Sequence, residues 1–289
     1  MYRLIYLLPI YFIVTVIVQA DDLVLIKPAQ RIVSLAPHIT ESLFSAGAGD
    51  KIVGVVSYSN YPEAAKKIKN VGSYNRLNLE LILSLKPDLV VAWHSVSSSN
   101  TIEKLKAFGV PVYLSDPTNL LDIARDIETY GRLAGTADVA KKTAELFRKK
   151  YHQIQQRYRG QSKVDVYYQI WKKPMMTINK DHFISQVIQL CGGDNVFGNV
   201  KVLTPTISTE AVLDKNPAMI VVSGMGQSRP EWLCEWQSWQ QIRAVKNNYL
   251  YFINPDLMQR PTMRILQGAE KLCQQIDEVR NQYAKSPSC

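Results

Sequence analysis

Short apolar runs alternate with amphipathic segments from residue 31 onwards. In the first half of the chain, β-rich runs and helical patterns follow one another at residues 31–35, 40–47, 51–55, 78–85, 88–93, 100–109 and 110–114. Thr40 and Gly47 are residue types that cap the two ends of a helix, and we expect them to cap the first one. Repeated alternation of this kind predicts an α/β lobe with a parallel sheet flanked by helices.

A second series of the same kind begins near residue 160. It consists of a strand at 164–170, a helix at 184–193, a helix and strand from Ile207, a strand at 249–253 and a helix from about Thr262. Three segments of the first series have counterparts here in the same order: 49–54 with 193–198, 77–93 with 207–223, and 112–117 with 250–255. The shared order predicts two lobes of similar topology.

The counterparts are not evenly spaced. The offset is 144 residues between the segments 49–54 and 193–198, which both begin with Gly-Asp. It falls to 130 residues between the segments 77–93 and 207–223, which both contain a glutamate near the start of a helix. The first lobe therefore has 14 extra residues between these two segments. The extra segment contains the sequence YSNYP, residues 58–62.

The two series are connected by residues 136–160, for which we predict a single helix. Ala137 to Arg159 contains neither Gly nor Pro, and its predicted apolar stripe consists of Val139, Leu146, Tyr151 and Ile154. At 1.5 Å per residue the helix is about 35 Å long, enough to cross from one lobe to the other. Basic residues coat the rest of it; we expect them to be solvated, with contact to an acidic membrane surface as the alternative.

The N-terminus has the pattern of a secretory signal. Arg3 precedes an apolar run from Leu4 to Val18, and the small residue Ala20 comes directly before Asp21. A membrane-spanning helix needs about 20 apolar residues, so an uncleaved anchor is the less favoured alternative. We therefore expect a signal peptide at 1–20, an N-terminal α/β lobe at 21–135, the connecting helix at 136–160 and a C-terminal α/β lobe at 161–289.

Charge and cysteine content narrow the possible partners. The formal net charge of +9 permits attraction to nucleic acid or membranes, but export argues against nucleic acid as a partner. All four cysteines lie in the second half, at Cys191, Cys234, Cys273 and Cys289, and their spacing matches no zinc motif. In an exported protein they favour disulfides, and three complete pairings are possible.

Signatures of catalysis and of cofactor binding are scarce. The sequence has no GxSxG elbow and no GxxxxGK[ST] phosphate loop, and Ile52 stands where a dinucleotide fingerprint needs its third glycine. His38 and His94 follow strands of the first lobe, which makes capture of a metal ion a weak alternative. We therefore predict no enzyme, no cofactor and no metal site, and keep an exported hydrolase as a low-ranked alternative.

Aromatic residues at strand ends and in loops are more informative. They are Tyr58, Tyr61, Tyr74, Trp93, Trp171, Trp232, Trp236 and Trp239. In open α/β lobes these positions line ligand crevices, and aromatic faces suit a large flat ligand. Packing within the lobes is the alternative for each of them individually.

Four motifs of the sequence belong together. They are RIVSLAPHITESLFSAGAGDKIVGVVSYSNYP, LNLELILSLKPDLVVAW, CGGDNVFG and DLMQRPTMRILQGAEKLC. Together they resemble the periplasmic substrate-binding proteins of cobalamin ABC transporters. The first two also occur in the wider family that binds haem and ferric siderophores, which are the alternative ligands. The resemblance covers nearly the whole mature chain. It implies a monomeric periplasmic receptor with two α/β lobes and a rigid connecting helix, which holds a corrinoid between the lobes and delivers it to an inner-membrane permease and ATPase complex.

The same resemblance assigns ligand-binding and disulfide residues. The ligand-binding positions are Tyr58, Tyr74, Trp93, Trp171, Asp256, Leu257, Met258, Gln259 and Arg260. Trp171 lies one place beyond the aromatic position of the relatives, which Ile170 occupies here, and Thr204 stands in place of a tryptophan. The resemblance also implies a disulfide between Cys191 and Cys273, and leaves Cys234 and Cys289 either paired or free.

Glu80 and Glu210 occupy corresponding places in the two lobes. Each lies two residues after a capping residue, Asn78 or Ser208, in the first turn of a predicted helix. The resemblance implies that these carboxylates meet arginines of the permease. The alternative is purely structural, because the helix dipole favours a negative charge in the first turn.

Overall fold

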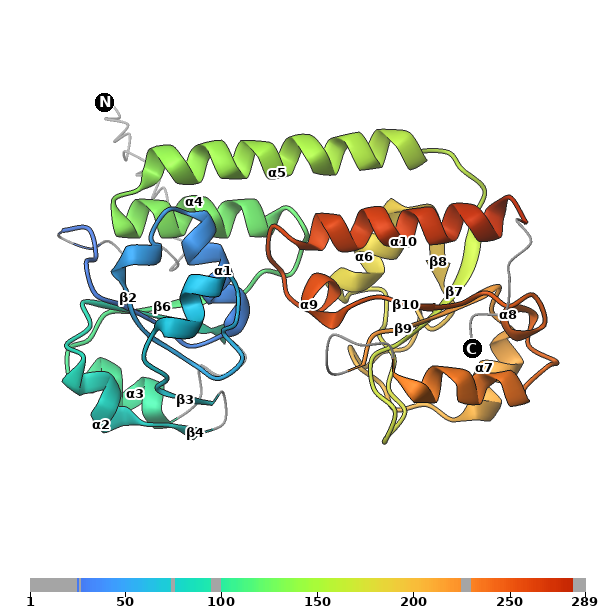
Figure 1. Cartoon of the computed structure of the whole chain (residues 1–289), viewed down its shortest axis with the longest axis horizontal. Coiled ribbons are helices and arrows are strands. Elements are labelled where there is room, and N and C mark those ends of the chain that lie inside the picture. Colours follow the sequence, from blue (N-terminus) through green and yellow to red (C-terminus); the bar gives the residue numbers. More distant parts are fainter. Residues whose placement is uncertain (1–24, 26, 74–75, 95–99, 225–229, 283–289) are drawn as a thin grey trace, which may run out of the picture.

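The computed structural model describes residues 25, 27–73, 76–94, 100–224 and 230–282, and shows two α/β lobes joined by a long helix (Figure 1). The sheet of the N-terminal lobe has the order β2 (Ile52–Val55), β1 (Ile32–Ser34), β5 (Leu89–Trp93), β6 (Val112–Ser115). The sheet of the C-terminal lobe has the order β8 (Gly193–Asn195), β7 (Val164–Gln169), β9 (Met219–Val222), β10 (Leu250–Phe252). All neighbouring strands in both sheets are parallel.

Counted along each lobe, both sheets run in the order second, first, third, fourth strand. The Gly-Asp turns lead into or open the second strands β2 and β8, and the segments at 112–117 and 250–255 contain the fourth strands β6 and β10. The prediction of a shared lobe topology is therefore confirmed.

Helices cover the sheets and connect their strands. They are α1 (Pro37–Ser45), α2 (Leu79–Ser84), α3 (Asn100–Ala107), α4 (Asp122–Ala134), α6 (Phe183–Leu190), α7 (Thr209–Lys215), α8 (Arg243–Lys246), α9 (Pro255–Met258) and α10 (Ile265–Arg280). Three 3-10 segments, η1 (Gly49–Lys51), η2 (Glu63–Lys67) and η4 (Glu231–Ser238), and a small hairpin of β3 (Gly72–Ser73) and β4 (Arg76–Leu77) complete the described elements.

Two helix starts follow the sequence and one does not. Asn78 accepts a hydrogen bond from the Leu81 amide at 2.9 Å, and Ser208 accepts one from the Ala211 amide at 3.3 Å, as N-caps of α2 and α7. The prediction that Thr40 caps the first helix is wrong, because α1 already begins at Pro37. Proline is favoured in the first turn because it lacks an amide hydrogen that would have no partner there.

The connecting segment forms one continuous helix, α5 (Ala137–Tyr158), which runs across the top of both lobes in Figure 1. Its predicted apolar stripe is partly wrong, because Val139 and Leu146 are 50% and 47% exposed. The residues of α5 that are buried are Ala140, Ala144, Phe147, Ile154 and Tyr158. The small side chain of Ala140 packs against Gly131 of α4, where an added Cβ atom would lie 2.2 Å from that of Ala140.

A disulfide joins Cys191, directly after α6, to Cys273 in α10, as the resemblance implied. Cys234 is also disulfide-bonded, and Cys289 lies outside the described residues. Within the described part of the chain, no helix is long and apolar enough to cross a membrane. The expected signal peptide at 1–20 also lies outside the described residues.

Candidate ligand-binding cleft

The candidate site lies where a loop at the carboxyl ends of the strands of one lobe contacts such a loop of the other. In parallel α/β sheets, ligands bind at these ends, because the loops there are free to vary while the sheet stays fixed. Trp93 ends β5, and the loop after β2 carries Tyr58. The loop after β10 carries α9 and Arg260, whose side chain reaches the main chain of Tyr58 in the other lobe.

Tyr58 is held in an unusual backbone conformation. Its φ of 68° lies in the left-handed region, which costs a residue other than glycine roughly 1–2 kcal/mol. Its side chain is 76% exposed, so packing does not hold the ring within its own lobe. The ring is thereby presented to solvent as an open aromatic face, as the ligand-binding prediction requires.

The Trp93 ring packs against a buried histidine, His38. The Trp93 and His38 rings meet edge to face with centroids 5.1 Å apart, and Trp93 remains 39% exposed. Burial, with a smaller contribution from the charge of Arg260, lowers the pKa of His38 to about 3. His38 Nε2 is buried and has no hydrogen-bond partner among the described residues. The imidazole of His38 is therefore neutral, and it contacts the Trp93 indole by edge-to-face packing.

The C-terminal lobe contributes a second group of aromatic residues. Trp171 is partly exposed, and its Nε1 donates to the Lys173 carbonyl at 2.9 Å. Trp232, Trp236 and Trp239 line a cavity of about 220 Å³ next to the end of β7. Trp236 is only 5% exposed and its Nε1 donates to Gln169 Oε1 at 3.0 Å, so this residue belongs to the core of the lobe.

The predicted ligand-binding segment Asp256–Arg260 does not present all its side chains to the cleft. Met258 is fully buried and packs against Gly268 of α10, so its side chain is not available to a ligand in this conformation. Leu257 is partly exposed, and Gln259 is exposed while its Nε2 donates to the Ser223 carbonyl at 2.6 Å. Met258, the last residue of α9, therefore faces the core, whereas Leu257 of the same helix and Gln259, which follows it, reach the surface.

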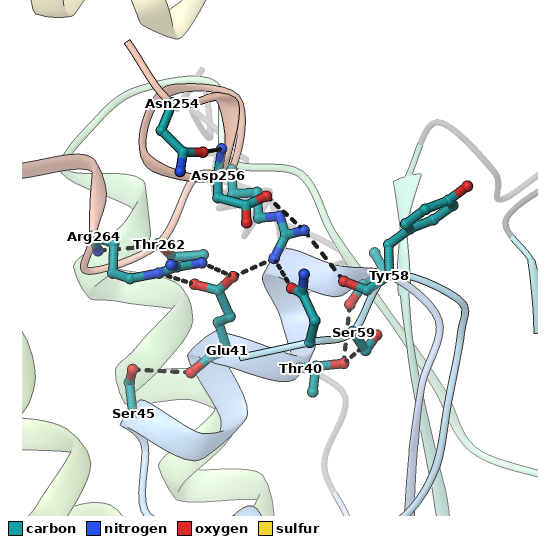
Figure 2. A network of polar contacts seen from close by, with 12 residues as sticks. Thr40, Glu41, Ser45, Tyr58, Ser59, Asn254, Asp256, Thr262 and Arg264 are labelled. Carbon is teal, nitrogen blue, oxygen red and sulfur yellow. Dashed lines mark hydrogen bonds and ion pairs between the residues drawn. The ribbon is translucent and has the colours of Figure 1, made fainter. Parts of the chain in front are cut away.

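A buried carboxylate links the two lobes at this point. Glu41 of α1 is 2% exposed, and its Oε1 accepts from Arg260 Nη1 at 2.7 Å. Arg264 Nε donates to Glu41 Oε2 at 2.9 Å, and its Nη2 donates to Glu41 Oε1 at 2.5 Å. Figure 2 shows Glu41 extending from α1 towards Arg264, while the Tyr58 ring points away from the network. Two arginines of the C-terminal lobe thus converge on one acid of the N-terminal lobe.

Both arginines also contact the loop that carries Tyr58. Arg260 donates to Asn60 Oδ1 at 2.9 Å and to the Tyr58 carbonyl at 3.2 Å, and its Nη2 pairs with Asp256 Oδ1 at 2.8 Å. The Arg264 guanidinium lies 3.9 Å from the centre of the Tyr61 ring. Sequence reasoning singled out neither Glu41 nor Arg264, because more than 200 residues separate the partners and no local pattern relates them.

The two corresponding glutamates are exposed on separate lobes. Glu80 lies in the first turn of α2 and Glu210 in the first turn of α7. Figure 1 shows both helices on the side of the molecule away from α5. Hydrogen bonds from the Ser208 side chain and from its own backbone lower the pKa of Glu210, so this carboxylate is ionised at neutral pH.

The ligand-binding role of Tyr74 stays a prediction. Tyr74 lies outside the described residues, and Thr204 is partly exposed. Among the described residues, no group of three or more His, Cys, Asp or Glu side chains is arranged to hold a metal ion.

The structure has the features of a bilobal solute-binding protein. It has two α/β lobes with parallel sheets, one connecting helix, and aromatic side chains in loops at the ends of the strands. A model of the periplasmic binding protein family matches residues 32–257. The chain belongs to the periplasmic binding protein family.

Two members of this family have sequences similar to this chain over most of their length. The chain is 37% identical over 253 residues to a vitamin B12-binding protein of Vibrio campbellii, which covers 88% of this chain and 91% of the relative. It is 34% identical over 260 residues to a vitamin B12-binding protein of Yersinia pestis, which covers 90% of this chain and 91% of the relative.

Solved structures agree with the observed fold. The periplasmic vitamin B12 binding protein BtuF of Vibrio cholerae superposes with a TM-score of 0.80 and 35% identity, over 88% of this chain and 98% of that one. The haem-binding protein RhuT of Roseiflexus sp. RS-1 has a TM-score of 0.76 at 22% identity, over 87% of this chain and 99% of that one. The second likeness concerns the fold alone.

Proposed function

We propose that this protein captures cobalamin between its two lobes and delivers it to an inner-membrane ABC importer. The observation that carries the proposal is the similarity to proteins named for vitamin B12 binding, which spans about nine-tenths of both chains. The cleft agrees with such a ligand, because a corrinoid is large and flat and suits exposed aromatic faces. A receptor for haem or a ferric siderophore is the alternative within the same transporter class.

In this proposal the ligand lies between aromatic surfaces of the two lobes. Tyr58 and Trp93 contact it from the N-terminal lobe, and Trp171, Leu257 and Gln259 from the C-terminal lobe. These side chains are at least partly exposed at the facing ends of the sheets, which supports their selection. Asp256 belongs to the same surface but also forms an ion pair with Arg260.

Calorimetric titration tests the ligand. The mature protein, starting at residue 21, is titrated with cyanocobalamin, haemin and a ferric hydroxamate siderophore in separate runs. The proposal expects one cyanocobalamin per chain, and far weaker binding of the other two compounds. Binding of haemin or the siderophore without binding of cyanocobalamin would replace the ligand while leaving the transporter class unchanged.

We place the working protein in the periplasm as a monomer, after removal of residues 1–20. Membership of a periplasmic family supports the compartment, and the pattern of the first twenty residues supports the cleavage. N-terminal sequencing of protein from the periplasmic fraction should begin near Asp21. Recovery of full-length chain in the membrane fraction would favour the uncleaved anchor.

Docking on the importer is assigned to Glu80 and Glu210. Both carboxylates are exposed, and their helices α2 and α7 lie on the side of the molecule away from α5, one on each lobe, so they can meet two symmetry-related permease subunits. Reversal of both charges, Glu80→Arg with Glu210→Arg, should abolish association with the importer in detergent or nanodiscs while ligand affinity stays unchanged.

The control for docking is Glu145→Arg, which reverses one charge at an exposed position of α5. It should leave association intact. Unimpaired association of the Glu80→Arg, Glu210→Arg double variant would leave both glutamates with only their role at the helix N-termini.

A further inference from the structure

Arg260 has little capacity left to bind a ligand directly. Its two terminal nitrogens carry four hydrogens, and four acceptors lie within hydrogen-bond or ion-pair distance of them: Glu41, Asn60, the Tyr58 carbonyl and Asp256. Only the Nε hydrogen is outside this set. The side chain is 13% exposed, so the guanidinium is enclosed by these partners and faces solvent little.

Three of these four acceptors belong to the opposite lobe. Glu41 lies in α1, and Asn60 and Tyr58 lie in the loop that follows β2. The Tyr58 carbonyl accepts a second hydrogen bond from the Asn60 amide at 2.9 Å, so both of its lone pairs are in use. Arg260 therefore connects the C-terminal lobe to the main chain of the Tyr58 loop.

The Tyr58 loop needs such support because its backbone is strained. The φ of 68° at Tyr58 persists only if surrounding contacts hold it, and the exposed ring supplies none of them. Within its own lobe the loop is tied by Ser59, whose Oγ accepts from Thr40 Oγ1 at 3.1 Å. From the other lobe it is held by Arg260 at Tyr58 and Asn60, and by Arg264 at Tyr61.

We propose that Arg260 is a positioning residue that holds Tyr58 in its ligand-facing conformation from the opposite lobe. It acts through the Tyr58 main chain, and Glu41 and Asp256 orient its guanidinium for this purpose. The ligand-facing shape of the N-terminal lobe is then completed by the C-terminal lobe. This inference rests on the proposed function for its ligand, but its structural part concerns the free protein.

A double-mutant cycle separates this role from direct ligand contact. Arg260→Met should weaken cyanocobalamin binding about 10- to 100-fold, the effect of losing hydrogen bonds to a charged group. In a Tyr58→Ala background the same substitution should weaken binding by less than about threefold, since the residue to be positioned is gone. Equal losses in both backgrounds would show that Arg260 acts on the ligand independently of Tyr58, and would overturn the proposal.

Hydrogen exchange of the free protein tests the same claim without any ligand. Exchange of the Asn60 amide should accelerate at least about tenfold in Arg260→Met. The control Arg243→Met removes an arginine that pairs with Asp165 within the C-terminal lobe, and should leave this amide unchanged. A wild type that binds no cobalamin would refute the proposed function, but the exchange measurement would still decide the positioning role.

Asn60→Ala covers the case in which Arg260→Met fails to fold. It removes one acceptor of Arg260 on the loop and leaves every charge of the network in place. We expect weaker cyanocobalamin binding by about 3- to 10-fold and faster exchange across residues 57–61. Wild-type exchange and affinity in this variant, with a normal thermal melting curve, would contradict the proposal.

Discussion

The two lobes share a sheet order but secure the same pair of helices differently. In the N-terminal lobe, the chain that follows α1 is tied to the chain at the end of α4 by hydrogen bonds, from Thr136 Oγ1 to the Ala46 carbonyl at 2.7 Å and from Lys51 of η1 to the Ala134 carbonyl. In the C-terminal lobe, the corresponding helices α6 and α10 are joined by the disulfide of Cys191 and Cys273. Arg280 at the end of α10 also donates to the Cys191 carbonyl at 2.9 Å, so the C-terminal lobe adds a covalent bond to polar contacts of the kind that the N-terminal lobe has.

The lobes also contribute differently to the cleft. The N-terminal lobe supplies the longer loop after its second strand and the buried acid Glu41. The C-terminal lobe supplies two arginines that contact both. Features shared by the lobes, the capped helices with Glu80 and Glu210, lie away from this contact. The common scaffold thus carries the docking candidates, while the differences between the lobes lie at the candidate ligand site.

Removing the disulfide should have the largest effect on stability. Cys191→Ser with Cys273→Ser opens a closed loop spanning 82 residues, and should lower the free energy of unfolding by roughly 2–5 kcal/mol. Urea unfolding followed by tryptophan fluorescence suits this test, since four of the five tryptophans lie beyond residue 160.

The matched change in the N-terminal lobe is Thr136→Val. It removes one hydrogen bond and should cost about 1 kcal/mol. If the two variants lost equal stability, the covalent and polar fastenings would be equivalent, which contradicts the comparison of the lobes.

Neutralising Glu41 should have the next largest effect. Glu41→Gln leaves two mostly buried arginines without their shared counter-charge, and breaking a buried ion pair on one side costs roughly 3 kcal/mol. Chemical denaturation at pH 7 measures the loss. Glu80→Gln, an exposed acid of the same lobe, is the control and should stay within about 0.5 kcal/mol of the wild type. Similar values for both variants would show that the Glu41 network does not stabilise the molecule.

Elements with local signals could be predicted from the sequence, and those that depend on distant partners could not. The lack of Gly and Pro between Ala137 and Arg159 was sufficient to predict α5. The stripe that α5 buries was misplaced because the small residues Ala140 and Ala144 are buried, the first of them against Gly131 of α4, while the larger Val139 and Leu146 stay exposed. Apolar size alone therefore did not identify the buried face.

The candidate site divides in the same way. Tyr58 and Trp93 followed from strand ends and the resemblance, and both have exposed rings. The burial of Met258 depends on the approach of α9 to Gly268, and the ion pairs of Glu41 depend on the meeting of two lobes. Neither contact leaves a pattern in the nearby sequence.

Stability should fall in acid through one histidine in each lobe. Burial lowers the pKa of His38 to about 3 and that of His182 to about 4, against an unfolded value near 6.5. The unfolded state therefore binds more protons between these values, so this stabilisation is complete above pH 6.5 and is lost as the pH falls. Each histidine contributes a slope of at most about 1.4 kcal/mol per pH unit. The contribution of Asp126 to stability has the opposite pH dependence. Burial raises the pKa of Asp126 to about 6, so this contribution is lost as the pH rises through that value.

His38→Gln and His182→Asn remove these titrations one lobe at a time. Asparagine also keeps the N-cap that His182 provides to the Ile184 amide. The free energy of unfolding in urea, measured between about pH 4.5 and 7.5, should fall less steeply with decreasing pH in each variant than in the wild type. A fall as steep as that of the wild type in both variants would rule out the buried histidines as its cause.

The caps of α2 and α7 should give the smallest effect and the most equal one. Asn78→Ala and Ser208→Ala each remove one hydrogen bond to a helix amide, and each should cost about 1 kcal/mol. Thermal unfolding by circular dichroism measures both. A cost in one lobe that is several times that in the other would show that these corresponding positions are not equivalent.

The central claim is that the cleft between the lobes holds a corrinoid, and titration calorimetry of the mature protein tests it most directly. We predict saturable binding of one cyanocobalamin per chain, lost or strongly weakened when Tyr58 and Trp93 are both changed to alanine. No heat of binding with cyanocobalamin, together with saturable binding of haemin or a ferric siderophore, would contradict the account.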